Sequence, residues 1–580
     1  MKKFQKLLGM LSSKQRRSAA VLLCLMLVGM VMESLSIGLI VPALSLMMQG
    51  SLAQYPLLGP WLSSLGSVNH ERLVIVGILT LVGVNAVKAF FLGVLAWRQA
   101  RFIYGLQADL SQRLFVGYLR QPYTFHLQHN SAHLIHNAIN QVNDITGVFK
   151  HGLALIAETL VMLGITAVLL TVEPVGTIVV ALTFGLAGWG FSRLTRKHIL
   201  LWGQERQLHE GLRIQHLQQG LGGVKGVKLF GREDDFLAQY QLHNIGSARI
   251  AEHQSTLQAL PRLWLELLAV MGLAAVVMVM IEQGKPLDAI LSTLGLFAVA
   301  AFRVMPSTNR ALSGIQSVLF SLPAIEIIYS QIRQLNITPT LQQGIPVPFE
   351  KNLEIDRVSF CYPSVEIQAL SEVTLIIPQG ASVGFVGSSG AGKSTLVDIL
   401  LGLLTPTSGA VKIDGLDIQA NLRGWQDQIG YVPQSIYLTD GTLRRNIAFG
   451  LPADKIDESA ILQAIRAAQL EQFVNDLPQG LDTIVGERGV CLSGGQLQRI
   501  GIARALYHNP SVIVLDEATS SLDAATEHAV MQAVFALKGS KTIVIVAHRP
   551  STVEQCDRLY QIEMGKVVRE GLPSEMISSL

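Results

Sequence analysis

A series of long apolar stretches constrains the fold of this chain more than any other feature of its sequence. A helix needs about 20 apolar residues to cross the hydrocarbon core of a bilayer, and six stretches reach that length. They cover residues 19–48, 73–97, 149–170, 175–193, 263–282 and 289–320. Hydrophobic residues make up 49% of the chain and charged residues only 15%, in agreement with a membrane-embedded part. We therefore predict six transmembrane helices.

The fixed cations of the connecting loops predict how these helices are oriented. The loops assigned to the outside, 49–72, 171–174 and 283–288, carry only Arg72 and Lys285. Because Lys and Arg concentrate in cytoplasmic loops, we expect both termini of this integral membrane chain in the cytoplasm. The net charge of +3 gives no reason to expect nucleic acid as a partner.

Two polar stretches, 98–148 and 194–262, keep helical periodicity and should extend neighbouring helices into the cytoplasm. Each is expected to turn back near its middle, at 121–131 and 219–228, and to present a surface there to a soluble domain. Residues 1–17 are basic and precede an apolar run that is too long for a signal peptide and lacks a cleavage site. We expect them to lie on the inner membrane surface as an amphipathic segment.

A linker rich in Gln, Pro and Gly, residues 334–350, separates this part from the rest of the chain. From Leu353 onward, short apolar strands alternate with helices, which predicts an α/β domain with a largely parallel core sheet. The expected organisation is an all-α transmembrane domain at 1–340 and an α/β P-loop domain at 341–580.

A glycine-rich loop follows the expected strand Ser382–Val386 and opens an apolar helix. Its sequence is Gly387-Ser388-Ser389-Gly390-Ala391-Gly392-Lys393-Ser394-Thr395, which matches the phosphate-binding loop in both spacing and context. Backbone N–H groups at such a helix N-terminus surround the phosphates of ATP. The residues expected to bind ATP are Gly387, Ser388, Gly390, Gly392, Lys393, Ser394 and Thr395, with Ser394 also binding Mg²⁺.

A second apolar run, Val512–Leu515, ends in two acids, Asp516 and Glu517. A phosphate-binding loop requires a further metal ligand at a strand end, and Asp516 is the candidate for Mg²⁺. Glu517 follows directly and is predicted to be the general base that polarises the attacking water.

Between these elements lies Leu492-Ser493-Gly494-Gly495-Gln496 at the start of a helix, where it would form a second anion site. This pentapeptide is the signature of ABC transporters, and the chain resembles that superfamily over essentially its whole length. The resemblance implies a type I exporter-like membrane domain and dimerisation, because the signature acts on ATP held by the opposite subunit. The residues expected to act in trans are Ser493, Gly494, Gly495, Gln496 and Asp523.

The same resemblance assigns three further roles around the nucleotide. Tyr362 matches the aromatic residue that stacks on adenine, and Gln434 matches the glutamine that contacts Mg²⁺ and reports to the membrane domain. His548 matches the histidine that contacts the γ-phosphate. The segment Thr483–Gly489 resembles the one that contacts intracellular helices in exporters. With all these positions intact we expect a homodimer, although intact motifs are equally compatible with a heterodimeric partner.

The substrate is predicted from charges at membrane depth, which are costly and therefore candidates for function. Lys88, Arg262 and Arg303 fall in the inner half of the bilayer by residue counting. Three cations at a shared depth favour an anionic substrate. The alternative is structural: Arg262 pairs with Glu266, Lys88 extends to the interface, and Glu33 or Glu158 neutralises Arg303.

Within the superfamily, the segments around Arg262 and Arg303 resemble flippases of lipid-linked oligosaccharides, and the apolar outer loop at 57–65 resembles their external helix. Lys88 stands where an arginine is expected, which keeps the charge and loses the bidentate geometry for phosphate. This resemblance favours a polyprenyl-diphosphate-linked oligosaccharide as substrate. The alternatives are other lipids of the lipid A type, hydrophobic drugs and peptides.

Four histidines, His126, His129, His133 and His136, fall at helical spacing. They could form a metal site or a pH sensor, but Asn130-Ser131 is expected to start a new helix and to break their common face. We favour a polar cytoplasmic surface.

Overall fold

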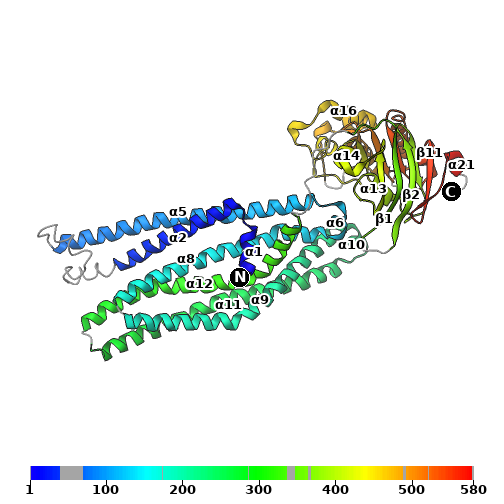
Figure 1. Cartoon of the computed structure of the whole chain (residues 1–580). Coiled ribbons are helices and arrows are strands. Elements are labelled where there is room, and N and C mark those ends of the chain that lie inside the picture. Colours follow the sequence, from blue (N-terminus) through cyan, green and yellow to red (C-terminus); the bar gives the residue numbers. More distant parts are fainter. Residues whose placement is uncertain are drawn as a thin grey trace. The chain divides into compact units, whose positions relative to one another are not determined.

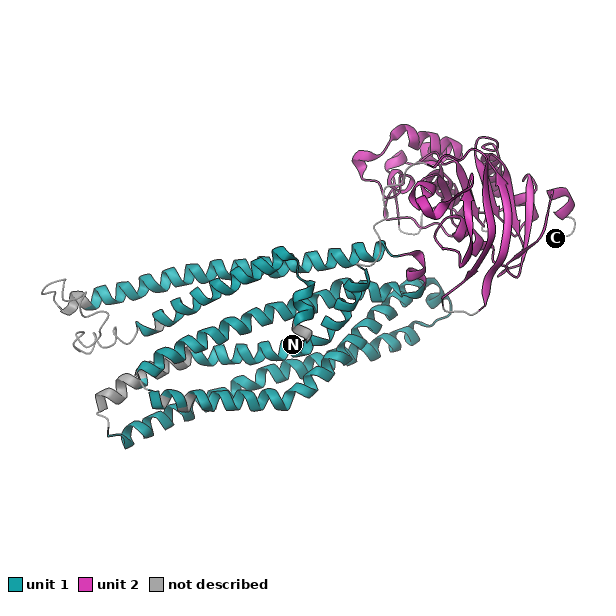
Figure 2. Cartoon of the chain, viewed as in Figure 1, with its two compact units in different colours: residues 1–121, 128–339 teal, residues 122–127, 340–580 magenta. Residues whose placement is uncertain are grey.

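The computed structural model describes residues 2–39, 70–172, 174–284, 287–335, 347–363, 367–486, 492–519 and 522–577. The chain divides into two compact units (Figure 2). The first comprises residues 1–121 and 128–339, and the second comprises residues 122–127 and 340–580. Helices build the first unit, and the strands of the described residues all belong to the second.

Long helices dominate the first unit (Figure 1). They are α2 (Ser13–Gly38), α5 (His70–Leu119), α8 (Val142–Val172), α9 (Pro174–Gly222), α11 (Glu233–Glu282) and α12 (Leu287–Leu335). Four of them, α5, α9, α11 and α12, contain 49 or 50 residues. At about 1.5 Å per residue such a helix is about 75 Å long, more than twice the hydrocarbon core of a bilayer. The expected extensions beyond the membrane are therefore continuous with the spans.

Within the described residues, five helices are long and apolar enough to cross a bilayer. They cover Ser13–Ser36, Val74–Leu119, Ser131–Thr171, Glu233–Glu282 and Val304–Leu335, and each overlaps a predicted span. The remaining predicted span, 175–193, forms the first part of α9, in which several side chains lie outside the described residues.

Short helices fill the two predicted turns of the extensions. The first turn holds α6 (Tyr123–Gln128), followed by α7 (Ser131–His136) and a π-helical turn at Asn137–Gln141. The second holds α10 (Val224–Leu229). The segment 122–127 groups with the second unit.

The N-terminal segment differs from the expected single stretch 1–17. Helix α1 ends at Met10 and α2 begins at Ser13. The break is a capping box: the Ser12 N–H donates to Gln15 Oε1 (2.8 Å) and Ser12 Oγ accepts from the Gln15 N–H (3.3 Å). Helix α1 also packs on α12, where Lys6 pairs with Glu326. The basic residues after Ser12 therefore start the first long helix.

Two sheets organise the second unit. A four-stranded antiparallel sheet has the order β2-β1-β4-β5, and a six-stranded sheet has the order β12-β11-β3-β10-β9-β6. The pairs β11·β3, β3·β10, β10·β9 and β9·β6 are parallel, which confirms the predicted core. The strands are β1 (Asn352–Cys361), β2 (Gln368–Pro378), β3 (Ser382–Val386), β4 (Ser408–Ile413), β5 (Leu416–Asp417), β6 (Ile429–Val432), β9 (Val512–Asp516), β10 (Thr542–Val546), β11 (Arg558–Glu563) and β12 (Lys566–Gly571). A separate small pair joins β7 (Gly441–Thr442) and β8 (Ile484–Val485).

The parallel strands have apolar residues on both faces because both faces are covered. Every residue of β3 and β10 is buried, as are the first four of β9. The covering helices are α13 (Lys393–Leu400), α14 (Leu422–Gln426), α15 (Leu443–Ile447), α16 (Glu458–Ala467), α17 (Glu471–Asp476), α18 (Gly494–Leu506), α19 (Ala524–Phe535), α20 (Pro550–Val553) and α21 (Pro573–Met576). Short 3-10 turns lie at Ile418–Asn421, Ala453–Lys455 and Gly480–Asp482.

Candidate active site

Four neighbouring parallel strands carry the predicted catalytic elements at their carboxyl ends. The phosphate-binding loop follows β3, His548 follows β10, Asp516 and Glu517 end β9, and Gln434 follows β6. Because parallel strands end at the same edge of a sheet, residues that are far apart in sequence meet there. The sheet order β3-β10-β9-β6 therefore assembles one site from four motifs.

The phosphate-binding loop has a backbone that only glycine adopts without strain. Gly390 and Gly392 have φ angles of +78° and +106°, and a Cβ on Gly392 would lie 2.8 Å from the Ala369 carbonyl oxygen. The loop ends at Lys393, the first residue of α13, so the helix N-terminus points its unpaired N–H groups into the loop. Ser388, Gly390 and Ser394 are exposed.

Lys393 is buried and folds back over its own loop. Its Nζ donates to the carbonyl oxygens of Gly387 (2.8 Å) and Ser388 (2.9 Å). Burial lowers the pKa of Lys393, while the negative charges of Glu517 and Asp516 oppose that shift. The ammonium group of Lys393 is thus held at the phosphate-binding loop by two backbone carbonyl oxygens. A bound phosphate would supply the negative charge that pairs with it.

Tyr362 lies just beyond the end of β1, beside the helix that follows the loop. Its hydroxyl is 3.1 Å from Thr395 Oγ1, and its ring packs edge-on against Phe360 with centroids 5.0 Å apart. The aromatic ring is therefore fixed next to the phosphate-binding helix, a position from which its face can stack on a base.

The donor set fits the Mg²⁺ that accompanies ATP. Asp516 Oδ1 is buried and has no hydrogen-bond partner among the described residues. Burial raises the pKa of Asp516, the charge of Glu517 raises it further, and Lys393 opposes both effects. A buried carboxylate oxygen without a donor, next to a second carboxylate, suits a hard divalent cation. The exposed Ser394 hydroxyl and the Gln434 amide oxygen supply the further oxygens that the sequence predicted.

Glu517 is held by two of the other predicted catalytic residues. Gln434 Nε2 donates to Glu517 Oε2 (2.7 Å), and His548 Nε2 lies 2.7 Å from Glu517 Oε1. The backbone of Glu517 is in the left-handed region, with φ of +49°. Such strain persists only where the surroundings determine it, and it concentrates at functional sites. Sequence motifs placed these three residues near the nucleotide, but they did not predict this clamp on the carboxylate.

The signature residues begin α18 with a capping box. Ser493 Oγ accepts from the Gln496 N–H (3.2 Å), and Gln496 Oε1 accepts from the Ser493 N–H (2.9 Å). Asp523 is the N-cap of α19, and its carboxylate accepts hydrogen bonds from the N–H (3.0 Å) and the hydroxyl (2.7 Å) of Thr526. Gly495 packs so close to Thr526 that an added Cβ would lie 2.6 Å from its methyl group.

All five residues predicted to act in trans line a single cavity of about 450 Å³. Their described hydrogen bonds stay at the starts of α18 and α19 and do not involve the phosphate-binding loop. The chain thus carries an exposed helix N-terminus suited to an anion and, separately, a phosphate-binding loop.

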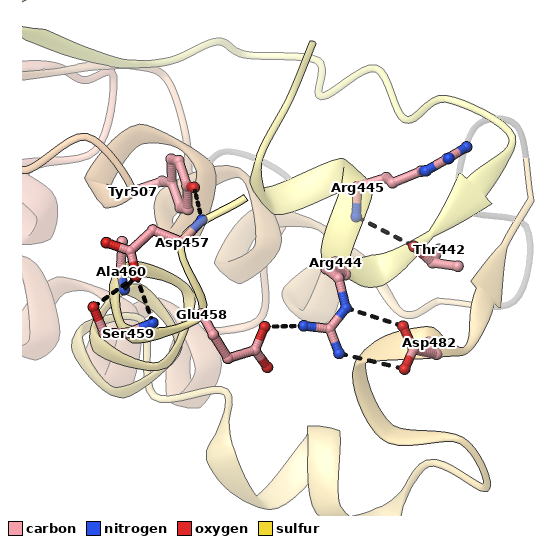
Figure 3. Close-up of polar contacts among 9 residues, drawn as sticks. All are labelled: Thr442, Arg444, Arg445, Asp457, Glu458, Ser459, Ala460, Asp482 and Tyr507. Atoms are coloured by element: carbon pink, nitrogen blue, oxygen red, sulfur yellow. Dashed lines mark hydrogen bonds and ion pairs between the residues drawn. The ribbon is translucent and has the colours of Figure 1, made fainter. Parts of the chain in front are cut away.

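A polar network in the helical part of this unit was not predicted. Arg444 donates to both carboxylate oxygens of Asp482 (3.0 and 3.3 Å) and also pairs with Glu458 (Figure 3). Next to it, the Asp457 N–H donates to the hydroxyl of Tyr507 (2.9 Å), the C-cap residue of α18. The network joins α15, α16 and α18, and so fixes the helix that presents the signature.

Arg504 adds a second link within the same layer. This side chain of α18 donates to the carbonyl oxygens of Asn446 (2.8 Å) and Tyr437 (2.9 Å), and burial lowers its pKa to about 10. The segment that follows Gln434 is thereby tied to the signature helix. The sequence placed Arg504 on this helix and did not predict its role.

Two of the three candidate substrate residues, Lys88 and Arg262, have polar partners within the membrane unit. Lys88 Nζ donates to Ser36 Oγ (3.1 Å) and lies 3.9 Å from the carboxylate of the buried Glu33. The side chain of Arg262 is 73% exposed and pairs with Glu266 at 3.2 Å, as the structural alternative predicted. Arg303 lies in α12, and its side chain lies outside the described residues. The described partner of Glu158 is Arg310, which was not considered (2.5 and 3.1 Å).

Three of the four neighbouring histidines lie on two different helices, and His129 lies between these helices. Asn130 accepts from the Ala132 N–H (2.8 Å) and caps α7, which confirms the predicted helix start. His126 lies on α6, whereas His133 and His136 lie on α7. Within the described ranges, no group of three or more His, Cys, Asp or Glu side chains is arranged to hold a metal ion.

Two predicted features lie outside the described residues. They are the outer loop at 57–65 and the last three residues, 487–489, of the segment Thr483–Gly489.

Comparison with known proteins agrees with this architecture. The family model described as "ABC transporter" matches residues 370–520, and the one described as "ABC transporter transmembrane region" matches residues 39–280. The chain is similar in fold to a bacterial Atm1-family ABC exporter with ATP bound, with a TM-score of 0.77, 21% identity and coverage of 97% and 96% of the two chains.

Curated relatives extend the similarity across both units. An ATP-dependent lipid A-core flippase of Cupriavidus metallidurans is 30% identical over 86% of this chain and 84% of its own length. One of Ralstonia nicotianae is 31% identical over 81% of this chain and 79% of its own length. The chain belongs to the ABC transporter family, as an exporter-type half-transporter whose membrane unit is fused to an ATP-hydrolysing domain.

Proposed function

We propose that the chain is half of an ATP-driven flippase that moves a phosphate-bearing lipid of the lipid A type across the bacterial inner membrane. The observation that carries this proposal is the similarity to lipid A-core flippases over most of both chains. In the orientation that we propose, both termini and the nucleotide-binding domain face the cytoplasm, so the lipid is taken from the inner leaflet.

The geometry supports specific roles for the residues of one nucleotide site. The glycine loop surrounds the phosphates, Lys393 pairs with the β- and γ-phosphates, and the Tyr362 ring stacks on adenine. Ser394, Asp516 and the Gln434 amide oxygen would hold Mg²⁺, which supplies charge neutralisation between the β- and γ-phosphates when bound. Glu517 accepts a proton from the attacking water, and its clamp by Gln434 and His548 keeps the carboxylate in place.

A second copy of the chain would complete each site. Ser493, Gly494, Gly495 and Gln496 form an anion-binding helix start whose described contacts leave the phosphate-binding loop of the same chain unengaged. In a head-to-tail homodimer, this helix start faces the γ-phosphate held by the partner, and Asp523 links the two sites. ATP then lies between the two domains and holds them together.

The relatives alter the ranking of substrates that the sequence suggested. The sequence favoured a polyprenyl-diphosphate-linked oligosaccharide, with lipid A-type lipids as an alternative. The relatives favour that alternative. Both substrates are amphipathic and carry phosphate groups, so cations at the inner leaflet suit either one.

The test uses the purified full-length chain in proteoliposomes with two fluorescent substrates, a lipid A and a polyprenyl-diphosphate oligosaccharide. ATP-dependent movement of the lipid A that disappears in Glu517→Gln supports the proposal. Movement of the oligosaccharide alone would restore the substrate predicted from sequence. ATP hydrolysis without movement of either lipid would contradict a flippase of phosphate-bearing lipids.

A further inference from the structure

Helix α9 carries a groove that no function assigned above uses. Its volume is about 550 Å³. The described residues that line it all come from little more than three turns of α9: Trp189, Ser192, Arg193, Arg196, Lys197 and Leu200. Three of these six are cations, and each of the three is exposed.

The depth of the groove follows from the aromatic residues around it. Tryptophans concentrate at the interface between lipid and water, and Trp189 lies four residues before the cytoplasmic end of the predicted span 175–193. On the neighbouring α11, Trp264 starts the span 263–282 and packs against Phe191 of α9, with ring centroids 5.8 Å apart. Both helices thus meet the interface at the same level, and the cations follow within two turns on its cytoplasmic side.

The cations of the groove have no carboxylate partner among the described residues, in contrast to four other cations of this unit. Lys88, Arg206, Arg262 and Arg310 each pair with an acid. Arg193, Arg196 and Lys197 have no acidic partner among the described residues, and residues 174–204 of the chain contain no Asp or Glu. Three positive charges within five residues of one helix repel one another unless an anion lies between them.

One cation of the groove, Arg193, is held in place by an aromatic side chain. The Arg193 guanidinium lies over the Trp189 ring, 5.7 Å from its centroid. An arginine stacked in this way keeps its N–H groups directed outward, and its planar fork suits two phosphate oxygens. The indole and Leu200 provide apolar surface beside it, as the border between a headgroup and its acyl chains requires.

We propose that this α9 groove is a binding site for the phosphate headgroup of a lipid in the inner leaflet. Arg193 and Arg196 bind the phosphate oxygens, Lys197 adds a third charge, and Trp189 packs against the top of the acyl chains. Basic pockets on the cytoplasmic side of membrane helices are suited to such headgroups.

Two lipids offer this chemistry: the transported lipid A-type substrate and a resident anionic phospholipid such as cardiolipin. The first alternative rests on the proposed function, whereas the second does not depend on it. The groove is proposed for the shared headgroup chemistry, and the experiment separates the two sources.

The experiment measures lipid binding to the purified full-length chain by native mass spectrometry, with diphosphoryl lipid A, cardiolipin and neutral phosphatidylcholine. The variant is Arg193→Gln with Arg196→Gln. The matched control is Arg98→Gln with Arg101→Gln, because these two arginines lie 5.6 and 5.5 Å from the Trp97 ring at the end of the span 73–97 and do not line the groove. Each double variant removes two interfacial arginines and one or more arginine–tryptophan contacts.

We expect the groove variant to lose about tenfold or more in affinity for at least one of the two phosphate lipids, since each basic residue near the surface contributes about one factor of five. The control should lose less than about twofold, and phosphatidylcholine should not respond. Arg193→Lys with Arg196→Lys should retain an intermediate affinity because charge is kept and the fork is lost. An equal loss in both double variants, or no loss in either, would overturn the proposal.

A second measurement identifies the source and separates this proposal from the function. In proteoliposomes, a groove that receives the substrate predicts that the groove variant needs about tenfold more lipid A to stimulate ATP hydrolysis. A groove for a resident phospholipid predicts an unchanged lipid A response together with lost cardiolipin binding. If the wild-type chain binds either lipid through the groove but flips none, the proposed function fails and the groove stands.

Discussion

The nucleotide site and the packed helices of the membrane unit treat their charged residues in opposite ways. In the nucleotide-binding domain, Asp516 and Glu517 lie together, one oxygen of Asp516 has no donor among the described residues, and Lys393 bonds only to backbone carbonyls. In the membrane unit, Lys88 lies beside Glu33 and Arg310 is paired with Glu158. Charge is left unsatisfied where a ligand is to bind, and it is matched internally where helices only have to pack.

This difference gives a criterion for reading charges in the membrane unit. A buried or interfacial cation with an acidic neighbour contributes to helix packing, and its presence at membrane depth alone does not indicate a substrate contact. By this criterion Lys88 and Arg262 contribute to helix packing, whereas the three cations of the α9 groove remain available to a ligand. The predictions below test the criterion on both sides.

The largest effect is expected in the nucleotide site, at Glu517. Glu517→Gln should lower steady-state ATP hydrolysis by roughly 10³-fold, because the amide cannot accept the proton of the attacking water. The Gln434 contact can persist, so ATP-dependent dimerisation should survive, as measured by size-exclusion chromatography with ATP. Glu471→Gln is the control, since Glu471 pairs with Arg466 on the surface. Turnover near the wild-type rate in Glu517→Gln would remove Glu517 from the chemistry.

A smaller effect is expected at a matched charge pair. Glu158→Gln leaves Arg310 without its bidentate partner, and only 15% of the Glu158 side chain is exposed. The free energy of unfolding should fall by about 1 kcal/mol, because the half-exposed Arg310 guanidinium loses its counter-charge and water screens part of the effect. Thermal unfolding of the detergent-purified chain measures this.

The double variant Glu158→Gln with Arg310→Met tests the reason for that loss. Removing both charges should restore much of the stability, because the unpaired cation is gone. The contrary outcome is a loss of unfolding free energy in the double variant that equals the sum of the losses in the two single variants. In that case Glu158 and Arg310 are not coupled, and this pair no longer supports the criterion.

A third prediction concerns pH and the nucleotide-binding domain. Burial raises the pKa of Asp398 to about 6, and the negative charge of Asp516 contributes to the shift. The folded state therefore binds the proton more tightly than the unfolded state, and the resulting stability is full below about pH 4 and lost as the pH rises through about 6. Asp398→Asn cannot ionise and should escape that loss.

We expect Asp398→Asn to raise the unfolding midpoint of this domain at pH 7.5, by the equivalent of about 1 kcal/mol after allowance for partial solvent exposure. Near pH 4.5 the variant and the wild type should differ little. Unfolding curves of the full-length chain at the two pH values give the comparison. A variant that is less stable at pH 7.5 would mean that the ionised Asp398 has a favourable partner.

The sequence predicted the nucleotide site far better than the membrane unit, for a physical reason. Phosphate binding demands glycines at positive φ, a lysine and a helix start in a fixed order, so residues 387–395 are readable locally. Gln434, Asp516 and His548 each follow or end a strand, and parallel strands end at the same edge of a sheet. Their proximity could therefore be predicted from the sequence. The clamp on Glu517 was not predicted, because side-chain contacts across three strand ends leave no pattern in the spacing of residues.

In the membrane unit the sequence fixes little beyond the length and hydrophobicity of each helix. These sufficed to predict the spans and their extensions. They did not predict that Glu158 faces Arg310, because which faces of two long helices meet depends on packing across the whole unit. The break between α1 and α2 could have been predicted from Ser12 and Gln15, which have the spacing of a capping box. It was missed because basic residues on both sides of Ser12 suggested one continuous segment.

The smallest effect on stability is expected for substitution of Arg262. Because the fold is then unchanged, the same variant can test whether Arg262 contacts the substrate. Arg262 is largely exposed, and exposed pairs such as Arg262–Glu266 contribute about 0.5 kcal/mol or less. Arg262→Gln should therefore leave the unfolding midpoint and basal ATP hydrolysis unchanged, as should Glu266→Gln.

Because neither variant perturbs the fold, any loss of lipid movement in Arg262→Gln has to come from the lipid itself. Flipping of fluorescent lipid A by the two variants then separates two outcomes. Equal, near-normal flipping assigns the pair to the helix surface and extends the criterion to the whole described unit. A loss confined to Arg262→Gln would show that a cation with an acidic partner can still handle the substrate, because the lipid phosphate then competes with Glu266 for the guanidinium.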